Sequence, residues 1–137
     1  MYRSTKKERN YHRYLGEEKR CYFCKPDPKA IVENFKSFYI MRNNFPYDFW
    51  DGQKVKNHLM VVAKKHFPAM DSKDKVLLLE YAILANDYSN KGFDIFVRVP
   101  NSPSRSQVHF HTHLIKASGK KFKSLKYTFK PYTLEVK

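Results

Sequence analysis

The sequence lacks several features that would assign it to other classes of protein. No run of apolar residues approaches the roughly 18 that a membrane-spanning helix needs. Residues 1–20 are charged and lack the apolar centre of a signal peptide. The chain has only 2 cysteines, Cys21 and Cys24, which is too few for a disulfide framework. These absences predict a cytoplasmic protein without a membrane partner, in which the Cys-x-x-Cys pair binds a metal or carries out redox chemistry.

Acidic residues are also scarce, with 13 Asp and Glu against 27 Lys and Arg, and the net charge is +14. The excess lies mainly at the ends, because residues 1–20 and 116–137 together supply +10. Two interpretations remain open for these ends. They solvate the fold, or they attract polyanions such as phosphate-rich small molecules or nucleic acid.

The length of 137 residues and the apolar content of 42% favour one domain with a core. The patterns predict strands over 36–42, 58–63, 93–99, 108–115 and 122–129, and short helices over 6–14 and 29–34. One long helix is predicted over 72–91, capped by Asp71 or Ser72 and ended by Gly92, with a buried stripe of Val76, Leu79, Ile83 and Leu84. The predicted fold class is α+β: an antiparallel sheet with one principal helix packed on it.

Three of the six histidines alternate in residues 108–115. Alternate side chains of a strand share a face, so His109, His111 and His113 are predicted to lie together. A histidine-rich polar face without chemistry is one interpretation. A metal centre and a nucleophilic imidazole are two others. A neutral imidazole needs no base to act as a nucleophile at pH 7.

The cysteine pair needs further ligands if it binds zinc, since a structural zinc site has four. No other cysteine exists, so histidine has to complete the site, with His12, His58, His66 and the alternating histidines as candidates. The alternative is two reduced cysteines packed in an apolar pocket.

The run His109-Phe110-His111-Thr112-His113-Leu114-Ile115 resembles the signature of the histidine triad (HIT) family, His-φ-His-φ-His-φ-φ, where φ is apolar and Thr112 is a mild departure. The resemblance also covers residues 21–24, 43–47 and 58–66, in the order of the family and at about its spacings. It therefore spans residues 21–116, between a basic N-terminal segment (1–20) and a basic C-terminal extension (117–137).

The resemblance implies a HIT-like nucleotide-binding fold, a homodimer through the 72–91 helix and the 93–99 strand, and cleavage at the α-phosphate of a nucleotide. His111 would be the nucleophile that forms a nucleotidyl-histidine intermediate, and His113 would contact the phosphate. By the same resemblance, structural zinc would be held by Cys21, Cys24, His66 and His109. The implied substrate-binding residues are Asn43, His58, Asn101 and Ser106, with a strand histidine satisfied by backbone as the alternative for His58.

The loop before the histidines departs from the pattern of the family. Residues 101–107 contain no glycine, whereas family members usually carry a glycine-rich turn that approaches the phosphate closely. Arg105 supplies a forked cation that would compensate by binding phosphate.

Two functions of different class follow. The first is a nucleotide hydrolase that acts on a dinucleoside polyphosphate, a nucleoside phosphoramidate or an adenylylated molecule. The second is a nucleic-acid-binding protein, or a nucleic-acid-end deadenylylase, that uses the basic ends. The intact triad favours the enzyme, and weak nucleic-acid binding is expected beside it.

Overall fold

Two central strands organise the molecule. A computed structural model describes residues 2–17, 20–129 and 132–136. Its sheet has the order β1-β2-β4-β6-β5, and β3 pairs with the start of β4. The helices and strands are α1 (Thr5–Glu17), β1 (Ile31–Asn34), β2 (Phe38–Arg42), β3 (Phe49–Trp50), β4 (Gln53–Ala63), α2 (Lys75–Asn90), β5 (Asp94–Phe96), β6 (His111–Lys121), β7 (Leu125–Phe129) and β8 (Tyr132–Val136).

All pairs in this sheet are antiparallel, and β4 with β6 form its centre. The register places His113 opposite Met60 and His111 opposite Val62. On the far side of β6, Phe96 of β5 is also opposite His113. The predicted α+β fold with an antiparallel sheet is confirmed, and the histidines lie on its central strand.

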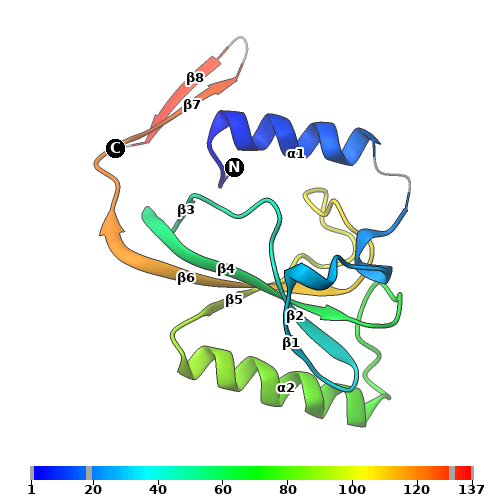
Figure 1. Cartoon of the computed structure of the whole chain (residues 1–137). Helices are drawn as coiled ribbons and strands as arrows, with labels where there is room; N and C mark the ends of the chain where they lie inside the picture. Colours follow the sequence, from blue (N-terminus) through cyan, green and yellow to red (C-terminus); the bar gives the residue numbers. More distant parts are fainter. Residues whose placement is uncertain (1, 18–19, 130–131, 137) are drawn as a thin grey trace.

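The two faces of the sheet carry different layers (Figure 1). On one face, α2 packs through Leu84 and Tyr88 against a core that includes Phe38, Val61 and Leu114. On the other face a smaller buried cluster is formed by Phe23, Ala30, Met41, Met60 and Val62. Helix α1 lies over this second face, so the sheet stands between the two helices (Figure 1).

The short helix predicted over 29–34 is wrong. Residues Pro28–Ala30 form a single 3-10 turn, which begins where the Asp27 side chain accepts a hydrogen bond from the Lys29 backbone at 2.9 Å. The chain then becomes the edge strand β1, which pairs with β2. Two adjacent β-branched residues, Ile31 and Val32, suit an extended backbone better than a helix.

The long helix exists, but its start and its buried stripe differ from the prediction. Asp74 caps it by accepting a hydrogen bond from the Leu77 backbone at 3.0 Å. Val76, Leu79 and Ile83 are 70%, 62% and 54% exposed, and we call them the apolar ridge. The core contacts come instead from Leu77, Tyr81, Leu84 and Tyr88. A helix with apolar side chains on several sides does not reveal its buried face by periodicity alone.

The histidine strand is shifted relative to the prediction. β6 begins at His111 and continues to Lys121, so His109 precedes the strand. After β6 the chain forms a separate β7–β8 hairpin (Figure 1). Of the C-terminal extension, residues 130, 131 and 137 lie outside the described residues. Neither helix in the described part of the chain combines the length and hydrophobicity of a membrane span.

Candidate functional site

The four residues that the sequence singles out for zinc meet at one place. One ligand atom from each of Cys21, Cys24, His66 and His109 lies within 4.8 Å of all the others. Cys21 Sγ is 3.4 Å and Cys24 Sγ 3.6 Å from His109 Nδ1. His66 Nδ1 is 3.3 Å from Cys24 Sγ and 3.1 Å from His109 Nδ1. The ligands therefore come from the start of the domain, the segment after β4 and the segment just before β6.

The donor atoms fit a tetrahedral metal ion. Metal–sulfur and metal–nitrogen bonds of about 2.3 and 2.0 Å imply edges of roughly 3.3–3.8 Å between ligands. The four separations given above, 3.4, 3.6, 3.3 and 3.1 Å, are close to these edges. His109 is fully buried, and its Nε2–H donates to the Ala63 carbonyl at 2.6 Å. This bond leaves the lone pair of Nδ1 facing the two sulfurs, as a ligand requires. The cluster could hold a metal ion.

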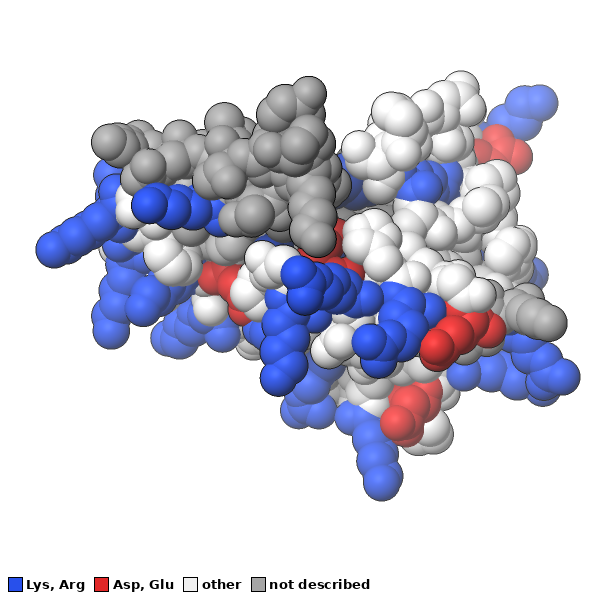
Figure 2. Space-filling view, turned by 90° about the horizontal axis from the view of Figure 1, so that it is seen from above, with Lys and Arg blue, Asp and Glu red and all other residues white. Residues whose placement is uncertain are grey.

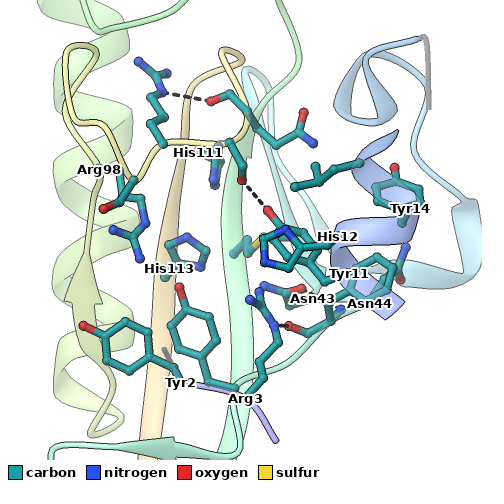
Figure 3. A pocket seen from close by; sticks show the side chains of 18 of the residues that line it. Tyr2, Arg3, Tyr11, His12, Tyr14, Asn43, Asn44, Arg98, His111 and His113 are labelled. Carbon is teal, nitrogen blue, oxygen red and sulfur yellow. Dashed lines mark hydrogen bonds between the residues drawn. The ribbon is translucent and has the colours of Figure 1, made fainter. Parts of the chain in front are cut away.

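Beside this cluster a cavity of about 400 Å³ opens next to His111 and His113 (Figure 3). Such a volume lies within the usual range for small-molecule sites. Its walls come from α1, the loop after β2, the 3-10 turn Tyr22–Cys24 and the loop before β6. Five of the residues that the sequence analysis proposed for catalysis or substrate binding line it: Asn43, Arg105, Ser106, His111 and His113.

The orientation of His111 is fixed by the residue that precedes the strand. His111 Nδ1 lies 2.8 Å from the His109 carbonyl and donates a hydrogen bond to it. The neutral ring therefore carries its proton on Nδ1, and Nε2 has an unshared electron pair. Burial lowers the pKa of His111 to about 4, and nearby cations, including Arg105 and Arg98, act in the same direction. The imidazole is neutral at pH 7.

His113 is held by a buried chain of hydrogen bonds. The Tyr47 backbone N–H donates to His58 Nδ1 at 3.0 Å, so neutral His58 carries its proton on Nε2. That nitrogen is 2.9 Å from His113 Nδ1 and donates to it. His113 then keeps its own proton on Nε2, which makes that atom a donor. Burial lowers the pKa of His58 to about 3 and that of His113 well below its usual value, so both rings stay neutral.

His58 itself does not line the cavity beside His111. It is 4% exposed and stands behind His113, with Asn43 Nδ2 3.2 Å from its Nε2. The Asn43 side-chain oxygen accepts a hydrogen bond from the Phe45 backbone at 2.8 Å. The structure thus gives His58 a supporting position between Tyr47, Asn43 and His113.

Arg105 uses its donors to fix its own loop. Its guanidinium donates to the carbonyls of Gln107, Pro68 and Val108 at 2.8, 2.5 and 2.7 Å. Arginine thus ties together a loop that has no glycine. Ser106 hydrogen-bonds through its hydroxyl to the Tyr11 hydroxyl, while Asn101 is exposed and does not line the cavity beside His111.

Two arginines at the cavity were not singled out from the sequence. Arg98 follows β5, and its guanidinium lies 5.1 Å from the Phe96 ring and close to His113 (Figure 3). Residues 96 and 98 share a face of the extended chain, because successive side chains point to opposite sides. Phe96 is paired with His113, so this register is the signal that could have identified Arg98. Arg3 is only 8% exposed and lines the same cavity, but nothing in the local sequence marks it as buried.

The fold is similar to that of solved HIT proteins. A HIT family hydrolase from Legionella pneumophila Philadelphia 1 matches with a TM-score of 0.57 and 23% identity, over 74% of this chain and 95% of that one. A HIT family hydrolase from Clostridium thermocellum matches with a TM-score of 0.57 and 17% identity, over 77% of this chain and 97% of that one.

A histidine triad protein from Clostridium difficile matches with a TM-score of 0.56 and 22% identity, over 77% of this chain and 96% of that one. No family model matches the sequence, and no curated protein matches it significantly. The structural matches establish the fold: the chain has the α+β HIT fold, as its sequence signature predicted.

Proposed function

We propose that the chain is a zinc-containing HIT-type hydrolase that cleaves nucleotides at the α-phosphate through a nucleotidyl-histidine intermediate on His111. One observation carries this proposal: the 2.8 Å hydrogen bond from His111 Nδ1 to the His109 carbonyl, which leaves Nε2 unprotonated on a side chain that lines the cavity. An imidazole in this tautomer attacks phosphorus without a separate base. The likeness to solved HIT hydrolases supports the same reaction class.

The reaction would run in two displacements. In the first, His111 Nε2 forms a bond to the α-phosphorus, and the bond from phosphorus to the leaving group breaks. In the second, the oxygen of a water molecule bonds to phosphorus and one of its protons passes to solvent, the phosphorus–nitrogen bond breaks, and the neutral His111 is regenerated. His113, with its proton on Nε2, would donate to a phosphate oxygen in both steps, and the buried His58 would hold it in that tautomer.

The charge at the cavity suits a phosphate group. Arg98 has no carboxylate partner within 4.0 Å among the described residues, so its charge is available to the phosphate oxygens. Among the described residues, Glu8 is the one carboxylate that lines the cavity, and it already pairs with Arg3. Phosphoryl-type transfer depends mainly on positioning and on such positive charge. A dinucleoside polyphosphate, a nucleoside phosphoramidate and an adenylylated molecule all present the required α-phosphate.

Zinc would be held by Cys21, Cys24, His66 and His109 and would have a structural role. Bound there, the ion supplies a rigid tie between the N-terminal part of the domain and the residue before β6. Because the carbonyl of His109 orients His111, this tie also keeps the nucleophile in position.

The reaction is tested by hydrolysis in water enriched in a heavy oxygen isotope. A panel of one dinucleoside triphosphate, one nucleoside phosphoramidate and one adenylylated amino compound is incubated with the protein. The proposal expects the isotope in the nucleoside monophosphate, because water attacks the α-phosphorus. Isotope only in the other product, or no product from any of the three, contradicts it.

We also propose that two chains pair through the apolar ridge of α2 and the adjoining β5 edge. Val76, Leu79 and Ile83 are more than half exposed, and Ile95, Val97 and Val99 of the 93–99 segment are 39%, 45% and 60% exposed. Exposed apolar side chains concentrated on one side favour an interface over a solvated surface. A homodimer with this surface on both partners would bury them.

A second candidate function, nucleic-acid binding, is favoured by a basic groove. The groove holds about 530 Å³ and lies behind Asn43 and Tyr47, and its cations are Lys7, Arg42, Lys54 and Lys56. Lys121 pairs with Gln53, so the lysines that end β6 stand beside the start of β4. Figure 2 shows Lys and Arg side chains projecting from several sides of the molecule, with few Asp and Glu between them. Such a surface suits a phosphodiester backbone.

A further inference from the structure

The N-terminal segment, residues 2–17, is fastened to the cavity rather than free in solvent. Arg3 Nε donates to the Phe45 carbonyl at 2.6 Å. Its guanidinium lies 4.2 Å from the centre of the Tyr11 ring and 4.8 Å from that of Tyr47. A nearly buried arginine is stable only where its charge and its donors are satisfied. Arg3 therefore fixes the start of the segment against the loop after β2.

Asp48 provides a second attachment. Its carboxylate accepts a hydrogen bond from the Ser4 backbone at 2.5 Å and pairs with Lys7. Its own backbone N–H donates to the Tyr2 carbonyl at 2.8 Å. Burial would raise the pKa of Asp48, but the bonds from Lys7 and Ser4 outweigh it and lower that pKa. The carboxylate is thus charged, and the first turn of α1 is held to the end of this loop.

The side of α1 that faces the protein is aromatic. Tyr11 and Tyr14 are three residues apart and so share a face of the helix. Their ring centres lie 5.2 and 5.0 Å from that of Phe45. Both rings and Phe45 line the cavity, and Figure 3 shows Tyr11 and Tyr14 extending from α1 beside it. Three rings from two elements thus form one wall, which we call the aromatic wall.

This wall borders the cavity, and none of its three rings is buried. No residue of α1 is buried, although the helix lies over the sheet. Tyr22 and Phe23 also line the cavity, and the centre of the Phe23 ring is 4.9 Å from that of His111. A flat, apolar group that enters beside His111 would therefore meet aromatic rings from α1, from the loop after β2 and from the turn Tyr22–Cys24.

The wall is also joined to the loop before β6. The Tyr11 hydroxyl hydrogen-bonds to the Ser106 hydroxyl, which connects α1 directly to this loop. The position of the wall is thereby tied to the loop that borders His111.

We propose that the N-terminal segment completes the substrate site and selects the substrate: the aromatic wall of Tyr11, Tyr14 and Phe45 stacks on the nucleobase while His111 faces the α-phosphate. This inference rests on the proposed function and assigns the base subsite to α1. Stacking on aromatic side chains holds any flat base without reading its edge. The site should therefore favour nucleotides over phosphates that lack a base, with little preference among bases.

The test uses two probes that differ only in the base: AMP and ribose 5-phosphate. Their dissociation constants are measured by calorimetry for the wild-type chain and for Tyr14→Leu, which keeps an apolar contact with Phe45 but removes the flat ring. Tyr11→Phe keeps the ring and removes only the bond to Ser106. Arg13→Ala, an exposed residue of the same helix, is the matched control. A melting curve of each variant verifies that it is folded.

The inference expects Tyr14→Leu to weaken AMP binding roughly tenfold and to leave ribose 5-phosphate unchanged. Tyr11→Phe should retain the preference for AMP, and Arg13→Ala should match the wild type. Arg98→Ala should differ from Tyr14→Leu by weakening both probes together, because both carry the phosphate.

Equal loss of both probes in Tyr14→Leu, or no loss of AMP, overturns the inference while the proposed function stands. If Tyr14→Leu is not folded, the double variant Tyr14→Phe, Tyr11→Leu is measured in its place. Equal loss of both probes, or no loss of AMP binding, in that variant overturns the inference in the same way. If the wild-type chain binds neither probe, the proposed function itself fails, and the inference fails with it.

Discussion

The carbonyl of His109 accepts a hydrogen bond from His111 Nδ1, while the His109 ring turns its own Nδ1 toward Cys21 and Cys24. One residue thus belongs to the candidate metal cluster through its side chain and fixes the candidate nucleophile through its backbone. The two sites share this residue, so loss of a ligand from the cluster should change the orientation of His111 in the cavity.

Removal of a metal ligand should release zinc and destabilise the fold. Elemental analysis of the wild-type chain should find one zinc ion per chain, and Cys21→Ser should lose it with a fall in melting temperature. His66→Ala should also lose the ion, because His66 Nδ1 belongs to the cluster. His58→Ala is the control, since His58 lies among Tyr47, Asn43 and His113. Zinc retained in His66→Ala but lost in His58→Ala would show that the wrong histidine has been assigned to the metal.

The buried His58 should make the fold sensitive to acid. The pKa of His58 is about 3 in the folded chain, whereas its ordinary value is 6.5. As pH falls, His58 is therefore protonated in the unfolded chain before it is protonated in the folded chain. The free energy of unfolding should therefore decrease from about pH 6.5 toward pH 3. Between pH 7 and pH 5 this residue accounts for a loss of about 2 kcal/mol.

Urea unfolding of the wild type and of His58→Gln at both pH values measures this contribution. The variant should lose less stability than the wild type on acidification, because it has one fewer proton to take up. The difference between the two losses reports His58 together with any change at His113, whose Nδ1 lies 2.9 Å from His58 Nε2. Equal losses in the two proteins would show that His58 is not buried in its neutral form.

The apolar ridge should govern assembly. Light scattering at high micromolar concentration should give twice the mass of the chain, and Ile83→Glu should give the mass of one chain. Ile83 is 54% exposed, so the substitution places a charge in the proposed interface without disturbing the core. Glu80→Gln on the same helix serves as the control. A wild-type chain that stays monomeric at this concentration rules out the proposed dimer.

The basic ends should bind nucleic acid weakly and leave turnover of small nucleotides intact. Replacing the exposed Lys120, Lys121 and Lys123 by Ala should flatten the dependence of oligonucleotide affinity on salt by roughly one unit per lost phosphate contact. Hydrolysis of a free dinucleotide should survive, because these residues do not line the cavity beside His111. Loss of that hydrolysis would place the lysines in the active site.

Much of the site could be predicted from the sequence because its signals are local. The alternating histidines, the Cys-x-x-Cys pair and His66 are recognisable by type and spacing, and the structure brings the two cysteines, His66 and His109 together. The strand that carries His111 is predictable for the same reason, since β-branched and aromatic neighbours favour extended chain. The fold that this signature implied is the fold observed here.

The remaining features depend on contacts between distant parts of the chain. In the sequence, Arg3 is one of several cations in the basic N-terminal segment. Only its position between Tyr11 and Tyr47 in the folded chain shows it to be buried. The sequence predicts Arg105 as a phosphate ligand, but it does not reveal the bonds from Nε and Nη2 to three backbone carbonyls that fix its own loop. Apolar residues lie on several sides of α2. Only packing against the sheet distinguishes the buried Leu84 from the exposed Ile83.

The most direct test of the proposed chemistry is to trap the intermediate on His111. The wild-type chain is mixed with a nucleotide substrate radiolabelled at the α-phosphate, denatured within one turnover, and separated from free label. The account predicts an acid-labile label on the peptide that contains His111. In His111→Ala it predicts no label, turnover lower by several orders of magnitude, and retained nucleotide binding. Equal turnover in His111→Ala, or label on another residue of the wild type, would contradict it.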